Sequence, residues 1–144
     1  MHLTYTKAQL ASLKVQMWAN QLGYVVSIPT VESRYDILVD VDGKIFRCQV
    51  KYAGRKLTSG ATELDLRKET RNNGKKRLYT KDEIDVILVY VPEEDKVLWI
   101  DHSKFHNRKS LTIRHIENTK CKQDSIFVND YIWVQSSVGR ADAS

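Results

Sequence analysis

Apolar residues near the N-terminus are spaced as in an amphipathic helix. They recur every three to five positions among more polar residues, at Leu10, Leu13, Met17 and Leu22. Such spacing gives a helix one apolar side. Thr6 is a favourable N-cap residue, and Gly23 favours the end of a helix. The pattern therefore predicts a helix from Thr6 to Leu22.

Two segments joined by Asp42-Gly43 give the clearest strand prediction. Residues 35–41 and 44–52 both alternate between apolar and polar side chains, which is typical of strands with one buried face. Asp-Gly readily adopts the positive φ angles that a two-residue type I′ turn requires. We therefore predict a β-hairpin, preceded by a short strand over residues 24–28 that ends at Pro29.

The apolar pattern continues in shorter segments. Residues 85–91 are almost entirely apolar and residues 96–100 follow after a turn, which predicts two central strands of a sheet. Residues 62–67 and 111–116 are candidate strands, residues 125–134 a short helix or strand, the polar run 68–76 a mobile loop and residues 135–144 a frayed tail. This order predicts one α/β domain with a mixed sheet over residues 1–134.

The register of the hairpin brings chemically distinctive residues together. With a two-residue turn, Asp36 lies across from Gln49, and Lys51 is on the same side of its strand as Gln49. Alternate apolar residues of both strands point to the opposite side, which is the predicted core. A solvated sheet face shows the same polar alternation, so the geometry alone leaves both interpretations open.

These residues suit the hydrolysis of a phosphodiester. A hard ion such as Mg²⁺ prefers oxygen ligands, and the Asp36 carboxylate, the Gln49 side-chain carbonyl and the Val50 backbone carbonyl could supply them. The ion would polarise a phosphate oxygen and activate a water molecule. Lys51 would orient that water or stabilise the charge that develops on the phosphate. A metal-dependent nuclease site is therefore one hypothesis for the hairpin.

Charge is concentrated in one segment. The formal net charge is +5, but residues 54–81 contain nine Lys or Arg and three acidic residues, a local net of +6. This excess favours a polyanionic partner, although a solvated basic loop is the plainer interpretation. The two cysteines, Cys48 and Cys121, indicate neither a disulfide framework nor a zinc site. With no apolar run of about 18 residues and no signal peptide, we expect the protein to stay where it is made.

The order of these motifs resembles the PD-(D/E)XK nuclease fold. Tyr35-Asp36 and Gln49-Val50-Lys51 follow a helix and Gly23-Tyr-Val-Val26, a variant with glutamine at the second acidic position. The resemblance covers about residues 7–116 and is strongest to homing endonucleases encoded in cyanobacterial group I introns of transfer-RNA genes. It implies a restriction-endonuclease-like core, a mixed sheet flanked by helices. It also implies a site-specific double-strand DNA endonuclease in the bacterial cytoplasm, using Mg²⁺ with Mn²⁺ as a substitute.

One position departs from the family pattern. The family has a glutamate on the first helix, and the corresponding position here is Ala11 or Ser12. Losing a carboxylate weakens the binding of a metal or of its water network, because hard dications prefer ionised oxygen ligands. Either the chain works with fewer acids, or it is a deliberately inactivated version that holds uncut DNA. We favour the second explanation.

The basic segment directly follows Lys51 and is expected to contact DNA beside the cleavage site. The candidate contacts are Arg55, Lys56, Arg67, Lys68, Arg71, Lys75, Lys76 and Arg77. The strand predicted over residues 62–67 could enter a groove, with Glu63, Asp65 and Arg67 facing the bases.

The resemblance also implies a homo-oligomer, a tetramer formed as a dimer of dimers, because so small a chain covers little duplex alone. The aromatic run over residues 127–133 is one possible interface. Two other functions remain open. One is a Holliday-junction resolvase or restriction-type nuclease on the same fold, and the other is a catalytically impaired DNA-binding module.

Overall fold

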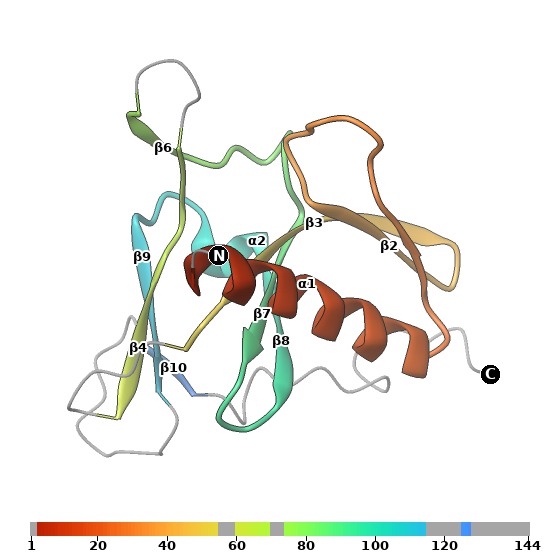
Figure 1. The fold of residues 1–144 in the computed structure, drawn as a ribbon. Helices are drawn as coiled ribbons and strands as arrows, with labels where there is room; N and C mark the ends of the chain where they lie inside the picture. Colours follow the sequence, from red (N-terminus) through yellow and green to blue (C-terminus); the bar gives the residue numbers. More distant parts are fainter. Residues whose placement is uncertain (1–2, 55–59, 70–73, 115–124, 128–144) are drawn as a thin grey trace.

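A five-stranded mixed sheet forms the centre of the molecule (Figure 1). The computed structural model describes residues 3–54, 60–69, 74–114 and 125–127. The strand order is β1 (Val25–Ser27), β2 (Ile37–Val41), β3 (Lys44–Tyr52), β7 (Val86–Val91) and β8 (Lys96–Asp101). Strands β3 and β7 run parallel, and the other neighbours run antiparallel. The predicted α/β class with a mixed sheet is confirmed, but β8 lies at the edge of the sheet and is not a central strand.

The hairpin formed by β2 and β3 has the predicted register. Val41 pairs with Lys44 across the turn, and the ladder continues to the pair of Ile37 and Cys48. Asp42 and Gly43 have φ angles of 52° and 97°, as a type I′ turn requires at both central positions. The turn is further held by Asp40, whose Oδ1 accepts a hydrogen bond of 2.7 Å from the backbone N–H of Gly43.

Helix α1 (Leu3–Gln21) covers one face of the sheet (Figure 1). It begins three residues before the predicted N-cap and ends before Gly23, whose φ of 81° closes the helix. The residues that it buries are mainly small, which lets the helix approach the sheet closely: Ala11, Val15 and Ala19, with Trp18 and Leu22 packed beside them.

The apolar side expected from the sequence is therefore not the side that packs. Leu10, Leu13 and Met17 are 39%, 53% and 47% exposed, and only Leu22 of the predicted set joins the core. We call Leu10, Leu13 and Met17 the α1 stripe. An exposed row of large apolar side chains is unusual on a monomer surface.

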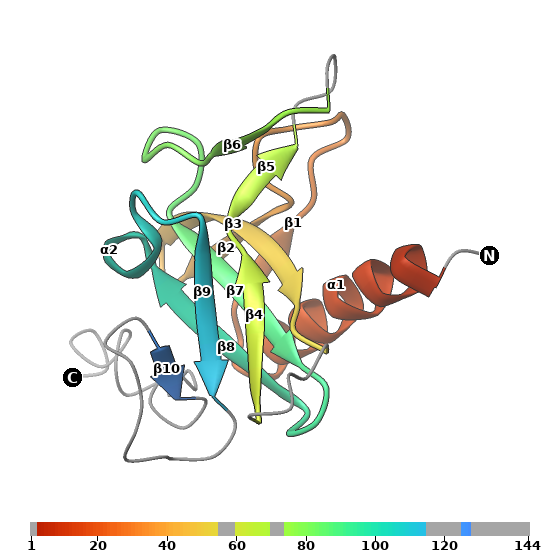
Figure 2. The ribbon, with the colours of Figure 1, turned by 90° about the vertical axis from the view of Figure 1, so that its left-hand side faces the viewer.

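A second, smaller sheet covers the other face of the central sheet (Figure 2). Its strand order is β10 (Ser125–Phe127), β9 (Ser110–Arg114) and β4 (Ala61–Asp65). Together with the short helix α2 (His102–Phe105), it buries Leu64, Ile113 and Phe105 against the central sheet. Strand β7 is consequently buried along its whole length, which explains its almost entirely apolar sequence.

Strands β5 (Arg67–Glu69) and β6 (Lys76–Leu78) form a separate two-stranded ribbon. The run 68–76 is therefore not simply a loop, since both of its ends belong to strands; residues 70–73 lie outside the described residues. The strand expected over residues 62–67 divides at Leu66, which is buried between β4 and β5. The candidate strand at 111–116 corresponds to β9, and the start of the segment 125–134, predicted as a short helix or strand, forms β10; residues 115–116 and 128–134 lie outside the described residues. The tail 135–144 lies outside the described residues.

In the part of the chain that the structure describes, no helix is long and apolar enough to span a membrane.

Candidate active site

The carboxylate of Asp36 lies at the open end of the hairpin, just before β2. The backbone N–H of Asp36 donates a hydrogen bond of 2.9 Å to the carbonyl oxygen of Cys48, which extends the pairing of β2 with β3 by one residue. Its Oδ2 accepts hydrogen bonds from Gln49 Nε2 at 2.8 Å and from the backbone N–H of Val50 at 2.9 Å. The structure thus brings Asp36 and Gln49 into direct contact.

The environment of Asp36 acts on its pKa in two directions. Desolvation by the surrounding protein raises the pKa of Asp36 above its ordinary value, while the Val50 N–H and the charges of Lys51 and Lys68 oppose that rise. Because the pKa is raised overall, the protein environment by itself disfavours the ionised carboxylate, and the Val50 N–H and the two lysines offset only part of that cost. A bound cation would favour the ionised form in the same way.

The donor set around Asp36 suits a hard metal ion only in part. Asp36 Oδ1, the Gln49 side-chain oxygen and a backbone carbonyl are oxygen donors of the kind that Mg²⁺ prefers. Among the described residues, however, no cluster of three or more His, Cys, Asp or Glu side chains could hold a metal. An ion here would depend on water and substrate phosphate oxygens for the rest of its ligands, as Mg²⁺ commonly does.

Lys51 lies on β3 beyond Gln49, above the ring of a buried tyrosine. Its Nζ is 5.7 Å from the centre of the Tyr79 ring, within the range of a cation–π interaction. Desolvation lowers the pKa of Lys51, whereas the carboxylates of Asp65 and Asp36 raise it and Lys76 lowers it further. Burial together with Asp36 also raises the pKa of Tyr79, so this phenol remains protonated. Lys51 is thus held above the Tyr79 ring, and its charge interacts with that of Asp36.

Helix α1 forms the wall opposite Asp36. A cavity of about 290 Å³ separates them, lined by Ala8, Gln9, Ser12, Asp36 and Val50. Ser12 therefore faces the site, with its Oγ accepting a hydrogen bond of 3.1 Å from Gln16 Nε2. The other candidate position, Ala11, does not line this cavity and is buried in the core, where it is 1% exposed.

Several of the basic residues predicted to bind DNA are held by acids. Asp65 Oδ1 and Oδ2 accept hydrogen bonds from Arg67 at 3.1 and 3.2 Å, and Oδ2 also contacts Lys76 Nζ at 2.8 Å. These cations keep the pKa of Asp65 far below its ordinary value. The side chains of Asp65 and Arg67 bond each other, and the expectation that Glu63, Asp65 and Arg67 face the bases stays a prediction.

Arg77 is held in the same way. Its two terminal nitrogens donate to the two oxygens of Glu83 at 2.6 Å each. Glu83 is only 4% exposed. The guanidinium of Arg77 makes the largest contribution to lowering the pKa of Glu83 to about 2, and the Thr80 N–H lowers it further. A bidentate pair with a buried carboxylate fixes the end of β6 against the segment before β7.

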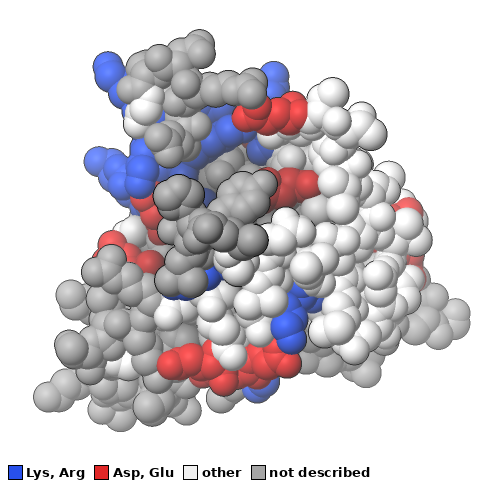
Figure 3. Space-filling model, in the orientation of Figure 1, with Lys and Arg blue, Asp and Glu red and all other residues white. Residues whose placement is uncertain are grey.

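The remaining basic candidates differ in position. Lys68 lines a cavity, and Lys75 is exposed. Arg55, Lys56 and Arg71 lie outside the described residues. Figure 3 shows Lys and Arg side chains gathered over the part of the surface where β6 lies in Figure 1. The predicted basic surface therefore exists, but part of its charge is balanced by Asp65 and Glu83.

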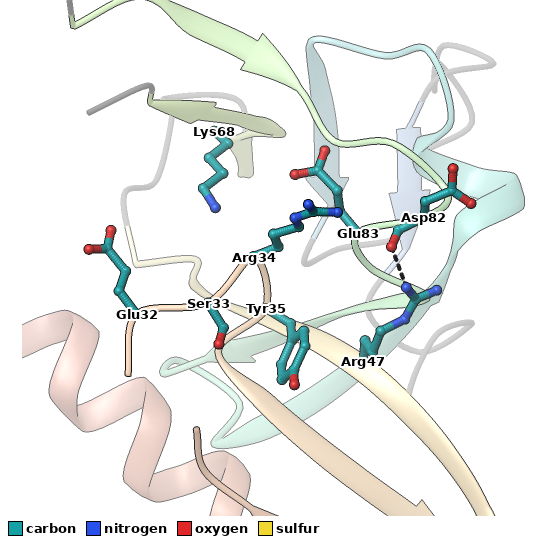
Figure 4. Close-up of a pocket in the computed structure, with 8 residues that line it drawn as sticks. All are labelled: Glu32, Ser33, Arg34, Tyr35, Arg47, Lys68, Asp82 and Glu83. Carbon is teal, nitrogen blue, oxygen red and sulfur yellow. Dashed lines mark hydrogen bonds between the residues drawn. The ribbon is translucent and has the colours of Figure 1, made fainter. Parts of the chain in front are cut away.

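A second cavity, of about 590 Å³, is lined by Arg34 and Tyr35, the two residues that precede Asp36 in the chain (Figure 4). One of its walls is fixed by Arg47, whose guanidinium bonds both oxygens of Asp85 at 2.9 and 3.1 Å and donates to the backbone carbonyl of Asp82. The lining residues come from the loop before β2, from β3 and β5, and from the loop before β7: Glu32, Ser33, Arg34, Tyr35, Arg47, Lys68, Asp82 and Glu83.

Sequence reasoning missed four residues near this site: Gln9, Arg34, Asp65 as an anchor, and Tyr79. Gln9 could have been found, since it is three positions from Ser12 on the same side of a helix. Arg34 could also have been found, because it is only two residues before Asp36 in the sequence. Nothing in the sequence pattern joins Asp65 or Tyr79 to Lys51, because the chain folds back to bring them there.

Comparisons with known proteins identify the family and the fold. Residues 2–132 match the family model described as PD-(D/E)XK endonuclease. The fold is similar to the solved structure of I-Ssp6803I, a bacterial homing endonuclease, with a TM-score of 0.69 and 25% sequence identity over 85% of this chain and 84% of that one. No curated protein matches the chain. With the family model spanning nearly all of its length, the chain belongs to the PD-(D/E)XK endonuclease family.

Proposed function

We propose that this protein is a site-specific double-strand DNA endonuclease, of the intron-encoded homing type, that depends on Mg²⁺ or Mn²⁺. The observation that carries this proposal is the contact of Asp36 with Gln49 beside Lys51, at the open end of one hairpin. The family match and the similarity to a bacterial homing endonuclease support it.

The residues of the chain have distinct roles in the proposed reaction. Asp36, with Gln49 and the Val50 carbonyl, would hold the divalent ion, which supplies Lewis acidity and an activated water molecule when bound. The Val50 N–H and the Gln49 amide orient the Asp36 carboxylate. Lys51 stabilises the negative charge that grows on the phosphate during attack, and the burial of its ammonium strengthens that interaction.

A catalytically impaired DNA-binding protein is the second candidate. The observation in its favour is Ser12, which lines the cavity opposite Asp36 where the family pattern has a glutamate. With a single carboxylate in the site, the affinity for a dication falls. Such a protein would bind the duplex through its basic surface and leave it intact.

A homo-oligomer, a tetramer built as a dimer of dimers, is part of the proposal. The α1 stripe supports it, because an exposed row of large apolar side chains is a common feature of subunit interfaces. Two active sites brought together by symmetry would cut the two strands of one target. The aromatic run 127–133 lies mostly outside the described residues, so the α1 stripe is the better-supported interface.

The experiment is a cleavage assay on a library of duplexes and on a four-way junction, with Mg²⁺ or Mn²⁺, comparing the natural chain with Asp36→Asn. Double-strand cuts at one sequence, lost in Asp36→Asn, are expected. Junction cleavage regardless of sequence would favour the resolvase alternative. Tight duplex binding without any cut, even after a glutamate is introduced at Ser12, would favour the DNA-binding module.

A further inference from the structure

We propose that the cavity of about 590 Å³ lined by Arg34 and Lys68 is a binding site for one phosphate of the DNA backbone. This phosphate would be held between the two cations, next to the phosphate that is cut. The inference rests on the proposed endonuclease function and names a second contact of the same substrate. Arg34 is not among the predicted DNA contacts, and Lys68 is predicted only as one of eight candidate contacts, with no particular phosphate or base assigned to it.

The cavity is close to the proposed reaction centre. Arg34 and Tyr35 line it and directly precede Asp36 in the chain. Lys68, on β5, is near enough for its charge to act on the Asp36 carboxylate. Phosphates follow one another about every 3.4 Å of rise along a DNA strand. A duplex that presents one phosphate to Asp36 carries further phosphates on either side of it, and the proposal assigns one of these to the cavity.

The walls of the cavity are fixed before DNA arrives. Arg47 is bound by Asp85 and by the backbone carbonyl oxygens of Lys81 and Asp82. Glu83 is bound by Arg77. In each pair the opposite charges neutralise each other, and the pairs hold β3, β6 and the loop before β7 in place. A rigid rim lowers the entropic cost of binding.

Arg34 and Lys68 are the cations left to interact with a ligand. Among the described residues neither forms an ion pair, and Figure 4 shows both among the residues that line the cavity, with Glu83 next to Arg34 in the view. A planar guanidinium and an ammonium on opposite elements suit the several oxygens of one phosphate.

The test measures binding of a short duplex as a function of salt, without divalent metal so that no cleavage occurs. The variants are Arg34→Gln, Lys68→Gln and the double variant. The control is Lys44→Gln, an exposed lysine at the far end of the same hairpin. Circular dichroism verifies that each variant is folded, and Mg²⁺-dependent cleavage by the natural chain is measured separately.

Each single variant is expected to weaken duplex binding roughly tenfold, while Lys44→Gln leaves it unchanged. Because both cations contact one phosphate, the double variant reduces the slope of log K against log salt by about one and loses less than the product of the single effects. Single variants that match Lys44→Gln would overturn the inference. The inference would also be overturned if the loss of affinity in the double variant equalled the product of the two single losses and its salt slope fell by about two. In that case each cation would hold its own phosphate.

The two proposals fail in different ways. If the natural chain cuts DNA but the variants match the control, the phosphate site is wrong and the endonuclease stands. If the variants show the expected binding pattern but the natural chain never cuts, the phosphate site stands and the protein is a DNA-binding module.

Discussion

The side-chain amide of Gln49 donates a hydrogen bond of 2.8 Å to Oδ2 of Asp36. This bond fixes the carboxylate across the open end of the hairpin, and the amide adds no charge to the site. A glutamine here therefore orients Asp36 without raising the electrostatic attraction for a dication. On the proposed mechanism, the affinity for the divalent ion depends on the residue at this position.

Changing Gln49 should alter the metal requirement in a predictable direction. Gln49→Glu adds a second ionised oxygen ligand and should lower the Mg²⁺ concentration for half-maximal cleavage roughly tenfold. Without metal, its carboxylate repels Asp36 and should lower the Tm. Gln49→Leu removes both the ligand and the hydrogen bond and should raise the Mg²⁺ requirement. A Mg²⁺ titration of the cleavage rate checks this, and an unchanged midpoint for Gln49→Leu would exclude Gln49 from the site.

Restoring the helix acid should depend on which position is used. Ser12→Glu places a carboxylate in the cavity opposite Asp36 and should raise the cleavage rate at least about tenfold. Ala11→Glu buries the charge in the core, where Ala11 is 1% exposed, and should destabilise the fold by about 3–5 kcal/mol. Cleavage rates and denaturant unfolding distinguish the two. No gain from Ser12→Glu would remove the explanation based on the missing acid.

The hairpin shows what sequence alone can determine about this site. The Asp-Gly turn sets the loop length, and alternation sets the buried face, so the pairing of Ile37 with Cys48 and the closeness of Asp36 and Gln49 follow by counting. Both features are local. The same holds for β7, whose continuous apolar run requires burial on both faces.

Other features depend on tertiary contacts that a single sequence does not specify. The larger side chains of α1 suggested its core side, but the sheet receives the small residues Ala11 and Ala19 because close approach gives better packing. The charged run around Lys68 and Lys76 suggested a loop. It forms a ribbon because Asp65 and Glu83, from outside the ribbon, neutralise part of its charge.

The ion pair of Arg77 and Glu83 should make stability depend on acid pH. The pKa of Glu83 falls from its ordinary value of 4.5 to about 2 in the folded protein, so its stabilising effect is complete above pH 4.5 and is lost as the pH falls toward 2. The free energy of unfolding should drop by about 2–3 kcal/mol over that range through this group.

Glu83→Gln provides the comparison for that pH range. The variant should be less stable than the natural chain at pH 7 and should lose less stability on acidification. Urea unfolding at several pH values measures both, with Glu93→Gln as an exposed control in the turn after β7. If the stability of Glu83→Gln and of the natural chain changed equally with pH, the pair of Arg77 and Glu83 would contribute no pH-dependent stability.

Subunit association should depend on the α1 stripe. Leu13→Lys places a charge in the centre of this exposed row and should shift the protein toward a smaller assembly, because burying an unpaired charge opposes association. Ile45→Lys, at a residue that is 59% exposed on the hairpin, is the control and should leave the mass unchanged. Light scattering after size exclusion gives the masses; identical masses for the two variants would assign the interface elsewhere.

The central claim is that the hairpin bearing Asp36, Gln49 and Lys51 hydrolyses DNA, and Lys51→Ala tests it most directly. Single-turnover cleavage of a target duplex with Mg²⁺ or Mn²⁺ should slow by about 10²–10³-fold, because the variant loses the ammonium that lies above Tyr79 and is proposed to stabilise charge on the phosphate. Lys44→Ala should cleave at the natural rate, and both variants should bind the duplex within about threefold of the natural chain. Cleavage by Lys51→Ala at the natural rate would contradict the proposed site.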